Sequence, residues 1–476
     1  MDIPYKKGSK RIIFLSAILL STVWLCMAPP NAYPLTVEQE RELGREFLAK
    51  IRKQLVLVKD DFVNEYVNDL GKYLIKPLET TYFPFDFYVV KNGGLNAFAA
   101  PGGHIFVFSG LIEAMDGADE LAAVMCHEIA HVSARHLAER IEQSKKISLG
   151  TLAGVLAGAL IGGQAGGAVM AGSAAAGIQT QLHFSRDDER QADQLGFKYT
   201  NQAGFDPAAM ITALNKIGRA HLGASKMPTY LMTHPSGPER MANMDSLLTG
   251  YTPKPESKET ATFRALFPYL QTVLAVRCRA PEEAEKLFQG ELERNPDSPL
   301  AHFGLGLVWK ESAEYDLAIE HLQKALKTDP GSKLIKRQLG ETYQLNEQGT
   351  EAVGVLETAA KRDDREDRDL FALAKSYQDQ ENYAKAIPLY EKLAATQPVK
   401  NEVFYNLGMC YGKAGKLALA HQNLGIFYRR MGDEEKAGFH FRKATDLASG
   451  DPNLRERIQK AAEGLPSKSN RPPSSR

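Results

Sequence analysis

The sequence has 476 residues, with 58 Lys and Arg balanced by 58 Asp and Glu, so its formal net charge is zero. This balance provides no electrostatic argument for nucleic-acid binding. Hydrophobic residues make up 43% and charged residues 24%, a composition typical of soluble globular proteins, and the length predicts two or more domains.

The N-terminal segment, 1–32, has the layout of a secretory signal. Residues 6–11 carry four positive charges and residues 12–27 carry none, before the stretch Ala28-Pro-Pro-Asn-Ala32. We expect cleavage after Ala32, and an uncleaved signal anchor is the alternative. Three cysteines would remain, at positions 126, 278 and 410, too few and too scattered to predict a disulfide framework.

Residues 33–248 predict one domain that combines helices with a small sheet. Amphipathic patterns indicate helices over residues 36–51 and 60–75. A strand is expected within residues 82–90, followed by two strands at 96–103 and 104–108 that a Pro-Gly-Gly turn joins. The first strand of this hairpin is a candidate edge to which an extended peptide substrate can add, and a plain structural hairpin is the alternative. The candidate substrate-binding residues are Asn96, Ala97, Phe98 and Ala99.

The segment His127-Glu128-Ile-Ala-His131 contains two histidines at positions i and i+4. On a helix these side chains share one face, so both rings can bind one zinc ion. Glu128 is turned by about 100° from His127 and is better placed to act as general base on a water at the metal. We expect this helix to begin near Asp119 as a side-chain cap and to continue to about residue 144.

Residues 149–182 form a stretch rich in Gly and Ala without charged side chains. Glycines recur at every fourth position from Gly150 to Gly162, which on a helix makes a bare face where another backbone can approach. We expect a helical hairpin that acts as a lid or lies on a membrane surface, and a membrane-inserted pair is the alternative.

A second pair of acids, Glu189 and Asp193, lies one turn apart on the next predicted helix. Zinc bound by two histidines needs a third protein ligand, and Glu189 is the candidate. Asp193 is then expected to orient a ligand imidazole through its far N–H. Farther on, His234 and Arg240 flank a proline-rich loop. His234 is expected to stabilise the oxyanion with help from Arg240, or to bind the metal as a fourth ligand.

An internal repeat follows a predicted linker at residues 249–262. Alanines at 284, 318, 352, 386 and 420 recur at one constant interval, and a large apolar or aromatic side chain follows each of them one helical turn later. This interval predicts a tetratricopeptide domain over residues 263–463, an α-solenoid that binds protein partners. Near its end the pattern restarts after half of the interval, so one helix is expected to serve two units. Residues 464–476 are predicted to be a disordered tail.

The motifs together resemble the bacterial zinc metallopeptidases related to the CAAX prenyl endopeptidases and the HtpX heat-shock protease. The resemblance covers residues 36–248 and rests on four segments. These are HEIAH at 127–131, ERQAD at 189–193, NAFAAPGG at 96–103, and His234-Pro with Arg240. It implies a gluzincin with His127, His131 and Glu189 on one Zn²⁺ and Glu128 as base.

The resemblance implies for His234 either support of the transition state or a self-inhibiting contact with the metal. The strongly apolar spans of membrane-embedded relatives are missing from the sequence, which indicates the secreted, periplasmic branch. The expected fold is therefore mainly α with a small β-sheet, a gluzincin-type domain followed by a tetratricopeptide solenoid.

The implied function is a zinc endopeptidase of periplasmic quality control that acts on misfolded or stalled outer-membrane proteins. Its repeats are expected to bind protein partners or substrates, including the outer-membrane assembly machinery. Residues 149–182 are expected to make peripheral membrane contact. The alternative is a chaperone or assembly scaffold whose peptidase is normally autoinhibited.

Overall fold

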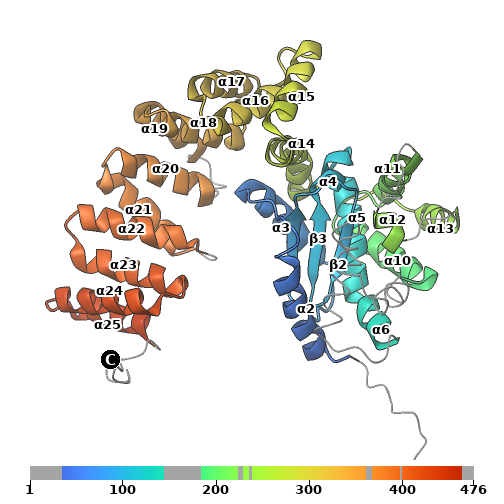
Figure 1. Cartoon of the computed structure of the whole chain (residues 1–476), viewed down its shortest axis with the longest axis horizontal. Helices are drawn as coiled ribbons and strands as arrows, with labels where there is room; N and C mark the ends of the chain where they lie inside the picture. The colour runs from blue at the N-terminus through green and yellow to red at the C-terminus, as the bar shows by residue number, and fades with distance from the viewer. Residues whose placement is uncertain are drawn as a thin grey trace, which may run out of the picture. The chain divides into compact units, whose positions relative to one another are not determined.

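The computed structural model describes residues 35–143, 184–222, 229–234, 238–360, 367–396 and 399–463. The chain divides into two compact units, residues 1–278 and 279–476 (Figure 1). Three predicted segments lie outside the described residues: the signal at 1–32, the Gly/Ala-rich hairpin at 149–182 and the tail at 464–476. Over the parts of the chain that the structure describes, every helix is too short or too polar to cross a membrane.

The first unit is mainly helical with one small sheet, as predicted. Its strands are β1 (Asp86–Val90), β2 (Ala97–Ala100) and β3 (His104–Phe108). Its helices are α2 (Val37–Ile51), α3 (Asp61–Ile75), α4 (Ser109–Ala114), α5 (Ala118–Ser133), α6 (His136–Gln143), α10 (Arg186–Gln202), α11 (Ala209–Leu222), α12 (Thr229–Thr233), α13 (Pro238–Leu248) and α14 (Lys258–Cys278).

The described sheet has the strand order β1-β3-β2, so β2 lies at one edge. β3 pairs in parallel with β1 and antiparallel with β2, which makes β2 and β3 the predicted hairpin. Phe98 and Phe106 join Leu43 and Phe47 of α2 in one core cluster. Because side chains alternate along a strand, Ala97 and Ala99 point to the other face, where their small size suits close packing. α5 contacts both β2 and β3.

The helix that carries His127 ends earlier than the sequence predicts. α5 ends at Ser133 and α6 begins at His136, because Arg135 has a left-handed φ of 58° that breaks the helix. Hydrogen bonds from the Arg135 guanidinium to the buried Glu40 carboxylate and to the Leu35 carbonyl oppose the cost of this conformation. The predicted side-chain cap is also wrong. Asp119 lies inside α5, and the N-cap residue is Gly117.

The boundary between the two units differs from the predicted one. The prediction placed a linker at 249–262 and the repeat domain from 263, but α14 begins at Lys258 and packs against α3, α4 and α5. Buried apolar side chains of α14, among them Phe267, Leu270 and Leu274, explain this placement. Arg264 of α14 also donates two hydrogen bonds to the Asp119 carboxylate. The first unit therefore extends to Cys278.

The second unit is a stack of helices. They are α15 (Pro281–Arg294), α16 (Pro299–Glu311), α17 (Tyr315–Thr328), α18 (Lys333–Leu345), α19 (Gly349–Ala360), α20 (Asp367–Asp379), α21 (Tyr383–Ala394), α22 (Asn401–Lys413), α23 (Leu417–Arg430), α24 (Glu434–Leu447) and α25 (Pro452–Ala462). The five alanines of the predicted repeat are all buried, with at most 5% of their surface exposed.

The structure confirms that one helix serves two helical pairs. A Cβ at Gly408 of α22 would meet Leu424 of α23, and a Cβ at Gly425 of α23 would meet Phe441 of α24. α23 thus packs as the second helix of the α22 pair and as the first helix of the α24 pair. Glycine permits these close approaches because it has no side chain.

Candidate metal centre

Four buried side chains of the first unit converge on one point. One potential ligand atom from each of His127, His131, Glu189 and His234 lies within 4.8 Å of the others. α5 supplies the first two residues, α10 supplies Glu189, and His234 directly follows α12. The structure therefore brings together the three ligands proposed from sequence, with His234 beside them.

Close packing of α10 on α5 creates this convergence. A Cβ added to Gly196 of α10 would lie only 3.2 Å from the Cα and N atoms of His127. The glycine therefore lets the two helices approach at the level of the ligands. Ser185 caps the start of α10 by accepting a hydrogen bond from the backbone N–H of Asp188, which fixes the first turn that carries Glu189.

The donor atoms lie close enough together to bind one metal ion. The Nε2 atoms of His127 and His131 are 3.1 Å apart, and Nε2 of His127 is 3.3 Å from Nδ1 of His234. Glu189 oxygens lie 3.5, 3.4 and 2.9 Å from His127, His131 and His234, respectively. Four donors about 2.0–2.1 Å from one ion at tetrahedral angles would lie about 3.3–3.4 Å apart. The donor set and its spacing therefore fit a cation such as zinc.

Glu128 lies beside this cluster but outside it. Its carboxylate is completely buried, and among the described residues neither oxygen has a hydrogen-bond partner. Nε2 of His234 lies 3.5 Å from Oε1 of Glu128. A buried carboxylate of this kind costs free energy, so its presence is consistent with a group kept ready for proton transfer.

Asp193 lies behind the proposed ligand His127. Its Oδ1 lies 3.0 Å from Nδ1 of His127, while Nε2 of the same ring faces the cluster. Arg240 donates hydrogen bonds from Nε and Nη2 to the two oxygens of Asp193. This arrangement holds the His127 ring in the orientation that directs Nε2 toward the metal position.

Arg240, which was expected to help His234, pairs with the carboxylates of Glu189 and Asp193. Its Nη1 lies 2.8 Å from Oε2 of Glu189, an ion pair without hydrogen-bond angles, and its other nitrogens bind Asp193. The reason is electrostatic: two buried carboxylates on one helix attract the guanidinium more strongly than an imidazole does. Arg240 therefore lies beside two of the proposed metal ligands, Glu189 and His127.

The electrostatics of the cluster favour an ionised ligand carboxylate. Burial alone would raise the pKa of Glu189, but the neighbouring histidines lower it well below its usual value. Burial lowers the pKa of His131 well below the usual value, so this ring is neutral. Burial and the charge of Arg240 would lower the pKa of His127, but Asp193 and Glu189 raise it to about 9. A cation at this position would take the place of that proton.

Sequence reasoning missed two residues that contact the ligands. His136, the first residue of α6, has its Nδ1 3.0 Å from Nδ1 of His131. The Phe184 ring packs against His131, with 4.0 Å between ring centroids. The histidine spacing in the sequence gives no signal for His136, because positions i and i+5 do not share a face of a continuous helix.

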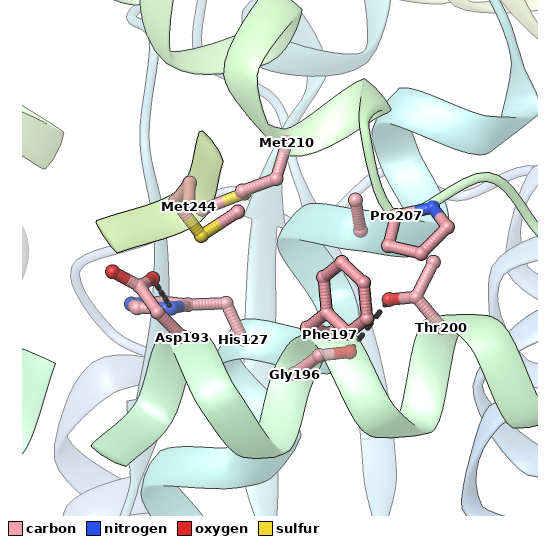
Figure 2. A pocket seen from close by; sticks show the side chains of 9 residues that line it. His127, Asp193, Gly196, Phe197, Thr200, Pro207, Met210 and Met244 are labelled. Atoms are coloured by element: carbon pink, nitrogen blue, oxygen red, sulfur yellow. Dashed lines mark hydrogen bonds and ion pairs between the residues drawn. The ribbon is translucent and has the colours of Figure 1, made fainter. Parts of the chain in front are cut away.

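Apolar side chains cover the His127–Asp193 pair on its far side. A small cavity there is lined by Met210, Met244 and Phe197 among others. Figure 2 shows the imidazole and the carboxylate in contact, with the two methionines above them. His127 and Asp193 are 1% and 3% exposed, so the pair is shielded from bulk solvent and its electrostatic attraction is strong.

The proposed substrate-binding residues lie at the sheet edge. Ala97, Phe98 and Ala99 belong to β2, the edge strand, and Asn96 directly precedes it. The Asn96 carbonyl accepts a hydrogen bond from the backbone N–H of Phe108. All four residues are buried, and β2 contacts the helix that carries His127 and His131.

Comparison with known proteins places these features in a family. Residues 62–248 match peptidase family M48, and residues 274–333 and 371–452 match the tetratricopeptide repeat. The chain is 30% identical over 305 residues to the beta-barrel assembly-enhancing protease of Yersinia pestis, covering 63% of this chain and 62% of that protein. The protein of the same name from Escherichia coli is 28% identical over 302 residues, covering 63% and 61%.

A mitochondrial relative matches over a shorter range. The mitochondrial metalloendopeptidase OMA1 of Schizosaccharomyces pombe is 31% identical over 207 residues, which is 44% of this chain and 59% of that protein. This chain thus spans less than two thirds of the length of each of these relatives. In a domain of this family the buried His and Glu cluster indicates a metal-ion site. We conclude that the chain contains a peptidase family M48 domain over residues 62–248, followed by tetratricopeptide repeats.

Proposed function

We propose that this protein is a zinc-dependent endopeptidase. The observation that carries the proposal is the convergence of four buried donors, all within 4.8 Å of one another, beside the buried carboxylate of Glu128, which has no hydrogen-bond partner among the described residues. Imidazole and carboxylate donors in this number and geometry suit zinc. His127, His131 and Glu189 would hold the ion, Asp193 would orient His127, and Arg240 would fix Asp193 and Glu189.

When bound, zinc would supply a Lewis acid that polarises the scissile carbonyl and activates water. Glu128 would accept a proton from the attacking water at one carboxylate oxygen and pass it to the nitrogen of the leaving amine. Hydrolysis then yields one carboxylic acid and one amine, and the Glu128 carboxylate is regenerated. Burial of Glu128 keeps competing hydrogen bonds away from it.

The proposed substrates are misfolded or stalled proteins of the cell envelope, including outer-membrane proteins. Two relatives are named beta-barrel assembly-enhancing proteases, which supports this class. An extended segment of substrate would add to the edge of β2 through main-chain hydrogen bonds, beside Asn96, Ala97, Phe98 and Ala99. Periplasmic localisation, supported by the signal-like residues 1–32, would give access to these substrates.

The tetratricopeptide unit would bind protein partners or substrates. The repeat match and the stacked helix pairs support this role, because solenoids present extended surfaces to other proteins. The outer-membrane assembly machinery is the partner that we propose. Peripheral membrane contact through residues 149–182 belongs to the same proposal.

The experiment compares the wild type with Glu128→Gln for zinc content and for digestion of an unfolded protein such as casein. We expect both proteins to bind about one zinc per chain and the variant to lose at least about 100-fold in cleavage rate. Chelation of the metal should abolish wild-type cleavage, and zinc should restore it. The control is Glu79→Gln, because the Glu79 side chain is 91% exposed. Cleavage by Glu128→Gln at the wild-type rate would contradict the proposal.

A second candidate is a chaperone or assembly scaffold whose peptidase is closed at rest. One observation favours it: Nδ1 of His234 lies 3.3 Å from Nε2 of His127 and 2.9 Å from Oε1 of Glu189, close enough to act as a fourth ligand where a catalytic zinc site keeps an open position. Stacking on Tyr230, with ring centroids 4.7 Å apart, supports the imidazole there. If Glu128→Gln fully supports outer-membrane protein assembly in cells, proteolysis is not the main task.

A further inference from the structure

His136 is a buried histidine placed between a ligand histidine and a polar side chain of α10. It is 1% exposed. Its Nδ1 lies 3.0 Å from Nδ1 of His131, and its Nε2 lies 2.8 Å from Oε1 of Gln191. On the other side of the same ligand, Nε2 of His131 faces the metal position, 3.1 Å from Nε2 of His127. Gln191, His136 and His131 therefore form a continuous chain of hydrogen-bonding groups that ends at the proposed metal position.

The direction of each hydrogen bond in this line follows from the ligand role of His131. A neutral imidazole has one N–H donor and one acceptor nitrogen, and a metal ligand must present the acceptor to the ion. If Nε2 of His131 binds the metal, the proton is on Nδ1 and is donated to Nδ1 of His136. His136 then carries its own proton on Nε2 and donates it to the amide oxygen of Gln191.

We propose that His136 is a positioning residue that fixes the tautomer and ring orientation of His131 for metal binding. The inference rests on the proposed zinc site. His136 would orient His131 as Asp193 orients His127, by accepting a hydrogen bond from the far N–H of the ring. His136 is neutral, whereas Asp193 is a carboxylate. Glu128, Glu189 and Asp193 already place three buried carboxylates around the cluster, and only Glu189 and Asp193 among them pair with the guanidinium of Arg240 in the described structure. A fourth buried carboxylate behind His131 would add a desolvation cost that a neutral imidazole avoids.

The break in the metal-binding helix makes this contact possible. On a continuous helix, residue 136 would be turned by about 140° from His131. The left-handed conformation of Arg135 starts α6 in a new direction and brings His136 back to the ligand. A backbone of this kind is unfavourable for arginine, and the Arg135–Glu40 ion pair, 2.9 Å long, helps to hold it.

Two substitutions at His136 separate positioning from space filling. In His136→Asn the side-chain oxygen is as many bonds from Cα as Nδ1 is, so it can still accept the proton of His131 Nδ1. In His136→Gln the polar atoms lie one bond farther out, near the former Nε2, and this acceptor is lost. The measurement is zinc affinity of the metal-stripped full chain by competition with a chromophoric chelator, together with thermal unfolding of the metal-free proteins.

We expect His136→Gln to lower zinc affinity by about 10- to 100-fold and His136→Asn to stay much closer to the wild type. The matched control is His321→Gln, because His321 forms a similar pair with His302, 3.0 Å between Nδ1 atoms, in the repeat unit. This control should leave zinc affinity unchanged.

Equal zinc affinities in all the His136 proteins would overturn the inference. The inference would also be overturned if His136→Asn and His136→Gln lost zinc affinity equally and lost metal-free stability equally. That pattern would indicate that His136 contributes only packing. A wild type that binds no zinc would instead refute the proposed function itself. The two failures are therefore distinguishable.

Discussion

Nδ1 of His234 lies 2.9 Å from Oε1 of Glu189, so a histidine that directly follows α12 shares the metal position with a carboxylate of α10. The opposite nitrogen of the same ring lies 3.5 Å from Glu128. His234 thus stands between a proposed ligand and the proposed general base. If the proposed zinc site is correct, the ring would occupy the position that a substrate carbonyl or a water molecule needs, and the proposed catalysis would require its displacement.

Replacement of His234 by alanine should therefore open the site. We expect His234→Ala to cleave an unfolded protein several-fold faster than the wild type and to bind zinc more weakly, because one of four donors is lost. Digestion rates and chelator competition on the same preparations test both effects. Proteolysis that stays equal or falls would mean that the ring serves the transition state and does not close the site.

Asp193→Asn should weaken metal binding without unfolding the domain. The substitution keeps the shape of the side chain but removes the charge that faces Nδ1 of His127 and the Arg240 guanidinium. We expect zinc affinity to fall by about 10- to 100-fold. Asp187→Asn on the same helix is the control, because the Asp187 side chain is 85% exposed. Similar affinities for the two variants would show that Asp193 does not support the ligand.

Breaking a buried ion pair should strongly destabilise the repeat unit. Nη1 of Arg337 on α18 lies 2.7 Å from Oδ1 of Asp369 on α20, and the side chains are 5% and 1% exposed. Asp369→Ala leaves a buried guanidinium charge and should cost about 3–5 kcal/mol of unfolding free energy. Denaturant unfolding of the full chain measures this loss of unfolding free energy. A spectroscopic probe attached to the repeat unit assigns the change to that unit.

The exposed pair Lys375–Asp379 on α20 provides the comparison, with side chains 40% and 46% exposed. Asp379→Ala should cost at most about 0.5 kcal/mol. The double change Arg337→Met with Asp369→Leu should recover much of the stability lost in Asp369→Ala, because neither charge is then buried. A loss no greater for Asp369→Ala than for Asp379→Ala would show that the buried pair contributes little.

Acid should weaken the attachment of α14 to α5 through Asp119. Burial would raise the pKa of Asp119, but hydrogen bonds from Arg264 and from the backbone N–H of Asp206 outweigh burial and lower the pKa. The unfolded value is about 3.9, so protonation favours the unfolded state. This contribution to stability is complete above the unfolded pKa and is lost as the pH falls through the lowered folded pKa.

The wild type should therefore lose more unfolding free energy than Asp119→Asn as the pH falls from about 5 to below the folded pKa of Asp119. Denaturant unfolding of both proteins across this range is the measurement. Arg264→Met should reduce the same pH dependence, because the main donor to the carboxylate is gone. Parallel stability curves for the wild type and Asp119→Asn would contradict this assignment.

Local and periodic features of the chain were determined by the sequence alone. His127 and His131 meet because positions i and i+4 share a helical face, and this requires no tertiary information. The constant interval between the repeat alanines predicts the helix pairs, and its shortened last step predicts the double role of α23. Alternation and the Pro-Gly-Gly turn predict the β2–β3 hairpin, because strand faces and turns are short-range properties.

Contacts between distant segments were decided by the tertiary structure. The sequence made Glu189 and His234 candidates, and the resemblance supported them, but only packing shows that His234 lies beside the proposed ligands and that Arg240 binds Asp193 and Glu189. The break at Arg135, which brings His136 behind His131, depends on the side-chain bonds of Arg135 to α2 and to Leu35 before it. α14 belongs to the first unit because its apolar side chains are buried against helices far away in the sequence. The pattern of apolar residues in a helix predicts which face is buried, but it does not predict which element packs against that face.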